Sequence, residues 1–186
     1  MILCWSLRLK SFFDFYKQEI DIFLNFIQKN LWVDQSIMSC YKDGFAYQSG
    51  FLDDYAYLAD ALLESLTVDW NRERFEWLEQ LVEKMVNEFY DSDSNAFRFS
   101  NEQDCPADII TFADDALPNG NAIAVKVLQA FGQLSANTDY THMANSILQS
   151  AADAMHKTPL GHATMLSALL MRDYRKHIVI RGNHID

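Results

Sequence analysis

Residues 50–59 read GFLDDYAYLA and begin the clearest helix in the chain. After Gly50, apolar side chains recur at spacings of three and four, which is the repeat of one helix face. Two adjacent acids, Asp53 and Asp54, occupy the first turn of this helix. Acids in that position usually cap the helix or interact with its positive end. In a cleft they could instead bind a hydroxyl group or transfer a proton.

The same helical repeat dominates the rest of the sequence, which has only six glycines and three prolines. We predict six helices, over about residues 12–30, 52–66, 72–90, 121–134, 140–155 and 159–174. Asn71 is the predicted N-cap of the third helix, and Thr158 with Pro159 begins the sixth. Short extended pieces are expected near residues 38–41, 97–99 and 178–180. Taken together, these patterns predict an all-α fold.

Alternate helices differ in character. The second, fourth and sixth predicted helices are rich in alanine and poor in charge, whereas the third has a charged outer face. The less charged helices should form the more buried layer. We therefore expect three helical hairpins arranged as an inner and an outer layer, as in solenoids and (α/α) toroids. In a toroid, the polar starts of the inner helices would gather at one end.

Composition excludes several classes of protein. The chain has 186 residues, 49% of them hydrophobic, and a net charge of -11, so it can bury one sizeable core but lacks the basic clusters that bind nucleic acid. No apolar run approaches the roughly 18 residues of a membrane span, and the first residues do not resemble a signal peptide. We predict a cytoplasmic protein with no nucleic-acid or membrane partner.

Cysteine and histidine spacing suggests no metal or redox chemistry. Cys4, Cys40 and Cys105 form no C-x-x-C pair, and the five histidines contain no H-E-x-x-H motif. We therefore expect reduced structural thiols, no metal site and no cofactor.

Three stretches resemble a known family: YKDG at 41–44, GFLDDYAYL at 50–58 and DALPNGNA at 115–122. They are similar to the C-terminal part of the YyaL-like, thioredoxin-domain-containing or spermatogenesis-associated proteins. The resemblance covers about residues 15–182. It implies an (α/α) toroid similar to those of N-acylglucosamine 2-epimerases and six-hairpin glycosidases, with a carbohydrate-related function.

The chain also departs from the family pattern. The thioredoxin-like domain and the first half of the toroid have no counterpart here. We expect residues 1–10 to be an unmatched segment, 11–176 a partial toroid of about three hairpins, and 177–186 a short strand and tail. Such a truncated half-ring would expose inner-helix faces. A homodimer, or a partner that supplies the rest of the toroid, would cover them.

The resemblance and the residue chemistry nominate Asp54, Asp115 and His162 as catalytic residues. A glycosidase needs two carboxyl groups, for which Asp54 and Asp115 are the candidates. A sugar epimerase or isomerase needs a proton-transfer base, for which His162 is the candidate. Each has a structural alternative, because acids cap helices, Asp115 lies in a loop, and buried histidines often only pack.

The proposed substrate-binding residues have structural alternatives too. Asp53, Tyr55, Asn119 and Asn121 could hydrogen-bond sugar hydroxyls. Asp53 could equally cap the helix, Tyr55 could belong to the core, and the asparagines could support a turn. The resemblance therefore implies a fragment of a carbohydrate-active or carbohydrate-binding domain that is not a competent enzyme alone, and leaves open whether any catalysis occurs. The alternative is a non-catalytic protein-interaction module.

Overall fold

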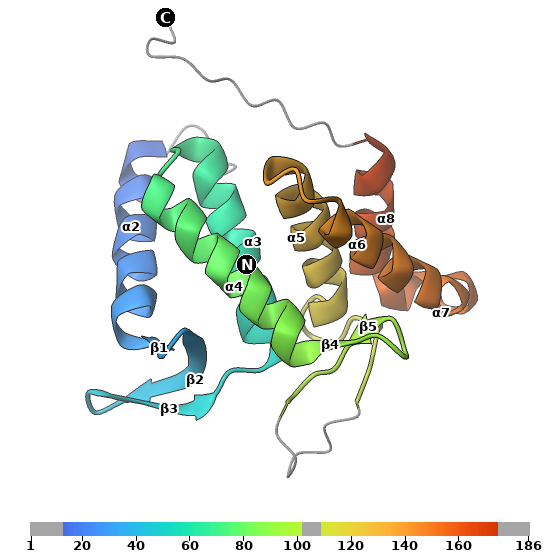
Figure 1. The fold of residues 1–186 in the computed structure, drawn as a ribbon, viewed down its shortest axis with the longest axis horizontal. Helices are drawn as coiled ribbons and strands as arrows, with labels where there is room; N and C mark the ends of the chain where they lie inside the picture. Colours follow the sequence, from blue (N-terminus) through green and yellow to red (C-terminus); the bar gives the residue numbers. More distant parts are fainter. Residues whose placement is uncertain (1–12, 102–108, 175–186) are drawn as a thin grey trace, which may run out of the picture.

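The computed structural model describes residues 13–101 and 109–174 (Figure 1). Its α-helices are α2 (Phe13–Asn30), α3 (Leu52–Val68), α4 (Arg72–Phe89), α5 (Gly120–Leu134), α6 (Thr138–Ser150), α7 (Ala152–Lys157) and α8 (Ala163–Tyr174). A 3-10 turn, η2 (Pro159–His162), precedes α8. The strands are β1 (Trp32–Val33), β2 (Ser36–Lys42), β3 (Phe45–Ser49), β4 (Tyr90–Asp91) and β5 (Ala96–Phe97).

The prediction of an all-α fold is wrong, because the described residues contain two antiparallel sheets. The larger sheet has the order β1-β2-β3, and the smaller pairs β4 with β5. The β2–β3 hairpin turns at Asp43 and Gly44, whose φ angles are 53° and 87°. Positive φ at both central residues matches the right-handed twist of a two-residue hairpin. Sequence reasoning recognised the turn and the extended piece before it, but missed the returning strand.

The chain ends lie outside the described residues. The predicted strand at 178–180 therefore has no structural description, and the same holds for residues 1–10 and 177–186 of the predicted domain layout. The predicted extended piece near Phe97 is present as β5, which pairs Phe97 with Tyr90 and Ala96 with Asp91.

The helices pack as neighbouring pairs. α5 lies at the centre of the helical part and packs against α3, α6 and α8, while α3 also packs against α4. In Figure 1, α3, α5 and α8 run in the same direction, and α4 and α6 lie in front of them. The starts of α3, α5 and α8 therefore lie at the same end. This packing does not establish the partial toroid expected from the resemblance.

The C-terminal helices differ in detail from the prediction. The expected helix at 140–155 is divided into α6 and α7, with Ala151 between them. The expected N-cap at Thr158 makes no side-chain cap hydrogen bond. Its hydroxyl instead donates to the carbonyl of Ala154 at 3.3 Å. The 3-10 turn η2 lies between Thr158 and the start of α8. By contrast, Asn71 caps α4 as predicted, by accepting the N–H of Arg74 at 2.9 Å.

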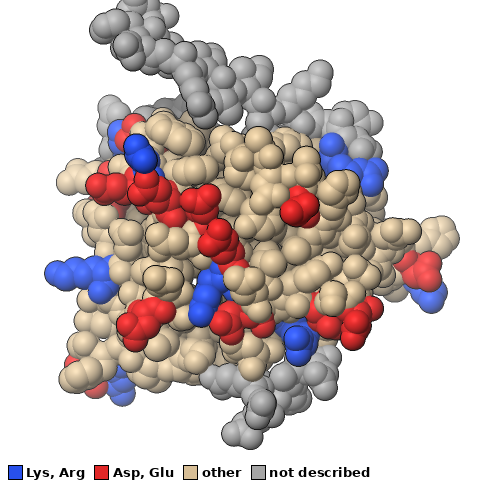
Figure 2. Space-filling model, in the orientation of Figure 1, with Lys and Arg blue, Asp and Glu red and all other residues tan. Residues whose placement is uncertain are grey.

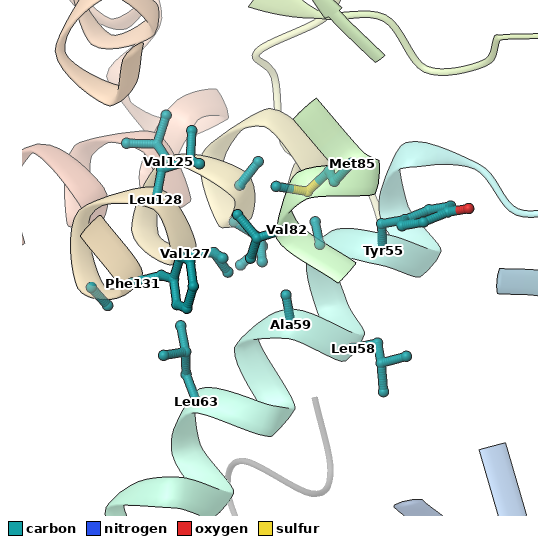
Figure 3. Packing of buried hydrophobic residues seen from close by; sticks show 14 of the residues in the cluster. Tyr55, Leu58, Ala59, Leu63, Val82, Met85, Val125, Val127, Leu128 and Phe131 are labelled. Carbon is teal, nitrogen blue, oxygen red and sulfur yellow. The ribbon is translucent and has the colours of Figure 1, made fainter. Parts of the chain in front are cut away.

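The hydrophobic core includes the region where α3, α4 and α5 meet (Figure 3) and extends to α2, α6 and α8. Small side chains such as Ala59 and Ala124 are fully buried and allow close helix contact. Larger side chains fill the space between the helices, among them Leu63, Val82, Met85, Leu128 and Phe131. This core fixes α3 beside α5, and so fixes the ends at which both helices begin.

The outer surface is strongly acidic along one helix. Figure 2 shows acidic side chains over α4, whose sequence contains glutamates at 73, 76, 79, 83 and 88. The opposite side of α4 carries buried residues such as Leu78 and Val82. None of the helices in the described ranges is both long and apolar enough to cross a membrane.

Candidate functional site

Asp54 holds the start of α3 in place. One of its carboxylate oxygens accepts the backbone N–H of Phe51 at 2.9 Å and the hydroxyl of Ser39, on β2, at 2.5 Å. Asp54 thus forms the acidic half of a capping box and ties α3 to the β2–β3 hairpin. Helix capping, the structural alternative for Asp54, accounts for its contact with Phe51, and attachment to the hairpin accounts for its contact with Ser39. Catalysis by Asp54 would require breaking hydrogen bonds that support the fold.

Asp53 has a different environment. Its half-buried carboxylate lies against the first residue of α5, because a Cβ added at Gly120 would lie 3.2 Å from Asp53 Cγ and overlap Oδ1. No hydrogen bond from the described part of the chain reaches this carboxylate. Burial raises the pKa of Asp53 above its usual value, and the charge of Asp54 raises it further. Asp53 is therefore a carboxyl group with unused hydrogen-bonding capacity.

Tyr57 lies one turn further along the same face of α3, four residues after Asp53. Its hydroxyl donates a hydrogen bond to the carbonyl of Pro118, in the loop before α5. Burial, together with the nearby charges of Asp53 and Asp114, raises the pKa of Tyr57 to about 12. Tyr57 thus remains neutral at physiological pH. The spacing of four residues between Asp53 and Tyr57 is the sequence signal that both lie on one face of the helix.

The two acids before α5 have opposite roles. Asp114 accepts the N–H of Asn119 on one oxygen and the N–H of Thr164 on the other, both at 2.9 Å. Its own N–H donates to the carbonyl of Gly161 at 2.7 Å. Asp115 is exposed, and no side-chain contact ties it to the described residues. The resemblance favoured Asp115, whereas the chemistry of two adjacent aspartates in one loop does not separate it from Asp114.

Asn119 and Asn121 are both buried and both hold the backbone. Asn119 caps α5 by accepting the N–H of Ala122 at 3.2 Å. The side-chain amide of Asn121 accepts the N–H of Phe97 at 2.7 Å and donates to its carbonyl at 2.8 Å. It thereby pairs with β5 as another strand would. These contacts leave the two amides little freedom to bind a ligand.

His162 and Tyr55 are also buried in structural contacts. The Nδ1 of His162 lies 2.8 Å from the carbonyl oxygen of Thr158, within the same turn of the chain. The hydroxyl of Tyr55 accepts the N–H of Ile37 at 3.1 Å, and its ring packs against Phe89. Burial raises the pKa of Tyr55 as well.

The structure thus brings together Asp53, Tyr57, Asp114 and Asn119, where α3, α5 and α8 begin. Asp54 and Tyr55 face the β2–β3 hairpin instead, and Asn121 faces β5. Among the contacts of the described residues, none joins Asp54 to Asp115. Within the same residues, no group of three or more His, Cys, Asp or Glu side chains could hold a metal ion. We refer to Asp53, Tyr57 and Asp114 below as the helix-start cluster.

Comparison with known proteins gives one distant match. The chain is 25% identical over 138 residues to spermatogenesis-associated protein 20 of Rattus norvegicus. The match covers 72% of this chain and 18% of that protein. No family model matches the chain. The similarity supports the expected family only distantly and is compatible with a fragment of a larger protein. It supports neither a toroid nor a carbohydrate function.

Proposed function

We propose that this chain forms part of a carbohydrate-binding site and does not carry out catalysis alone. The observation that carries the proposal is Asp53, a half-buried carboxyl group without a hydrogen-bond partner among the described residues, where two helices begin. The oxygens of Asp53 are not among the fully buried side-chain atoms that lack a partner in the described residues, so a ligand can reach them from solvent. A ligand hydroxyl would supply that partner.

The chemistry around Asp53 suits a hydroxyl-bearing ligand. A carboxylate accepts hydrogen bonds from hydroxyl groups, and a protonated carboxyl group can also donate one. The neutral Tyr57 hydroxyl provides further acceptor capacity beside it. The acidic surroundings disfavour anionic ligands, since Asp53 and Asp114 both raise the pKa of Tyr57 through their negative charge. A neutral sugar fits this cluster better than a phosphate or a carboxylate.

The contacts of the catalytic candidates argue against an enzyme. Asp54 is engaged by Ser39 and Phe51, and the Nδ1 of His162 lies against the Thr158 carbonyl. A glycosidase requires two carboxyl groups about 5–9.5 Å apart across the scissile bond. Asp54 is directed to β2 by its bond with Ser39, whereas Asp115 is exposed in the loop before α5. We therefore propose binding without bond cleavage.

The test is thermal unfolding of the purified chain with millimolar glucose, mannose or N-acetylglucosamine. A ligand that binds only the folded state raises the melting temperature. We expect one sugar to raise it for the wild type and for Asp153→Asn, a change at an exposed acid on α7. The same sugar should have no effect on Asp53→Asn. A shift that persists in Asp53→Asn would contradict the assignment.

A second candidate function is protein interaction, and an exposed apolar face favours it. Ile22, Phe23 and Phe26 on α2 are 53%, 52% and 43% exposed. Phe26 packs edge-on against Tyr41 of β2, with ring centroids 5.3 Å apart, so the face continues onto the hairpin. Contiguous exposed apolar surface is typical of interaction sites. We call these four residues the α2 apolar face.

We propose further protein as its occupant, because the distant relative has most of its length outside the matched region. Without that further protein, the α2 apolar face of the isolated chain is uncovered and should pair with a second copy, which sedimentation velocity measures. We expect concentration-dependent association that Phe23→Ser with Phe26→Ser abolishes, while the paired change Asn25→Ser with Gln28→Ser, at exposed polar positions of α2, preserves it. A wild-type chain that remains monomeric at high concentration would count against an uncovered apolar interface.

A further inference from the structure

We infer that Asp114 is a positioning residue that couples the start of α8 to the helix-start cluster. This inference rests on the proposed function. Asp114 contacts three chain segments: the start of α5 through Asn119, the turn η2 through Gly161, and the start of α8 through Thr164. No other residue of the helix-start cluster reaches α8 through a hydrogen bond described above.

The bonds between Asp114 and the α8 start are reciprocal. The N–H of Asp114 donates to the Gly161 carbonyl at 2.7 Å, while its carboxylate accepts the Thr164 N–H at 2.9 Å. The first N–H groups of a helix lack intrahelical partners. The Asp114 carboxylate supplies a partner to one of them across 50 residues of sequence. Such charge-assisted bonds are stronger than neutral ones.

The loop that carries Asp114 is also held from α3. Tyr57, on α3, donates to the Pro118 carbonyl, four residues after Asp114. Asp53 and Asp114 both act on Tyr57 through their charges, so a ligand at Asp53 would bind beside this connection. Through Tyr57 and Asp114, the loop is therefore connected to α3, to the start of α5 and to the start of α8. A ligand that binds at Asp53 and orders this loop would stabilise the hydrogen bond between Thr164 and Asp114. By thermodynamic linkage, that hydrogen bond would in turn favour binding of the ligand.

Hydrogen exchange of individual backbone amides tests this coupling on the intact chain, with glucose, mannose and N-acetylglucosamine as the probes. Asp114→Asn keeps the size of the side chain but removes one carboxylate acceptor. We expect exchange at Thr164 and Asn119 to accelerate about tenfold or more, because hydrogen bonds to charged groups are strong. Asp115→Asn, at the exposed neighbour, should leave both rates unchanged. Asp114→Glu, which restores two acceptors, should recover part of the protection.

The sugar experiment separates the coupling from the proposed function. If a sugar acts through Asp53, it should slow Thr164 exchange in the wild type and fail to do so in Asp114→Asn. A sugar that raises the melting temperature through Asp53 but leaves Thr164 exchange unchanged would overturn the coupling and spare the proposed function. If no sugar binds, the proposed function fails and the coupling to it fails as well. Accelerated exchange in Asp114→Asn would still show that the Asp114 carboxylate holds the start of α8.

The hydrogen bond from Thr164 to Asp114 is testable even where Asp114→Asn does not fold. In the wild type, the Thr164 amide should exchange far more slowly than amides at an exposed first turn, such as that of Asp153 on α7. Equal exchange rates at Thr164 and Asp153 would overturn the inference. Unchanged Thr164 exchange in a folded Asp114→Asn protein would overturn it as well.

Discussion

Asp53 and Gly120 are in direct contact across the starts of α3 and α5. A Cβ at position 120 would overlap the Oδ1 of Asp53 and lie 3.3 Å from a methyl group of Leu52. The carboxyl group therefore occupies the space that the missing side chain leaves. This contact leaves no room for a side chain at position 120 and partly buries Asp53, whose carboxyl group accepts no hydrogen bond from the described residues.

Gly120→Ala should displace the Asp53 carboxyl group without unfolding the chain, because the overlapping atom is the free end of a side chain. We expect the sugar-induced rise in melting temperature to disappear while the far-UV circular dichroism spectrum remains that of the wild type. Gly161→Ala is the matched control, since no atom of the described residues lies within 4 Å of a Cβ at that position. An undiminished sugar response in Gly120→Ala would show that the carboxyl position does not matter.

Asp53 should destabilise the fold at neutral pH. Its pKa is raised in the folded state above the usual value of 3.8, so folding is favoured by protonation and opposed by ionisation of this group. Asp53→Asn should therefore unfold at a higher urea concentration than the wild type at pH 7. The difference should shrink as the pH falls towards 4, where the wild-type carboxyl group becomes protonated. A variant less stable than the wild type at pH 7 would indicate a favourable interaction of the ionised group.

Asn121 should matter for stability rather than for binding. Asn121→Ala removes both hydrogen bonds to the backbone of Phe97 and leaves a buried N–H and a buried carbonyl without partners. Each orphaned group costs about 1–3 kcal/mol. Urea unfolding should show a loss in that range or above, and the sugar response should persist at a temperature where the variant is folded. A loss below about 0.5 kcal/mol would contradict the strand-like role, because surface substitutions produce effects of that size.

Asp54 and Ser39 should be energetically coupled. Asp54→Ala removes the capping-box contact as well as the Ser39 hydroxyl bond, so a loss of about 0.5–2 kcal/mol is expected from the cap alone. A double-mutant cycle with Ser39→Ala isolates the bond between α3 and the hairpin. We expect the two changes together to cost less than the sum of the single changes. Strict additivity would mean that the 2.5 Å contact contributes no free energy.

The helices could be predicted because each leaves a periodic apolar pattern. The start of α3, the Asn71 cap and the approximate ends of α2, α4 and α5 all follow from spacing and capping chemistry. Of the β2–β3 hairpin, only the returning strand β3 was missed, although Asp43-Gly44 is a strong hairpin signal. Strand β3 is short and mostly exposed, so it has no strong alternating apolar pattern.

The candidate site was only partly predictable. Its location at the starts of alternate helices follows from the sequence, because polar residues precede each of them. The roles of individual side chains depend on tertiary contacts that spacing does not encode. Asp114 and Asp115 are adjacent and chemically identical, yet only Asp114 meets Thr164, which is 50 residues away. In the same way, the partner of Asp54 is on β2 and the partner of Tyr57 precedes α5.

Calorimetric titration of the wild type and Asp53→Asn, with the sugar that most raises the melting temperature, tests the central claim most directly. The account predicts saturable binding to the wild type and none to a folded Asp53→Asn protein. Equal affinity of the two proteins, or no binding of any sugar to a well-folded wild type, would contradict a carbohydrate site at Asp53. The α2 apolar face would then be the surface to investigate.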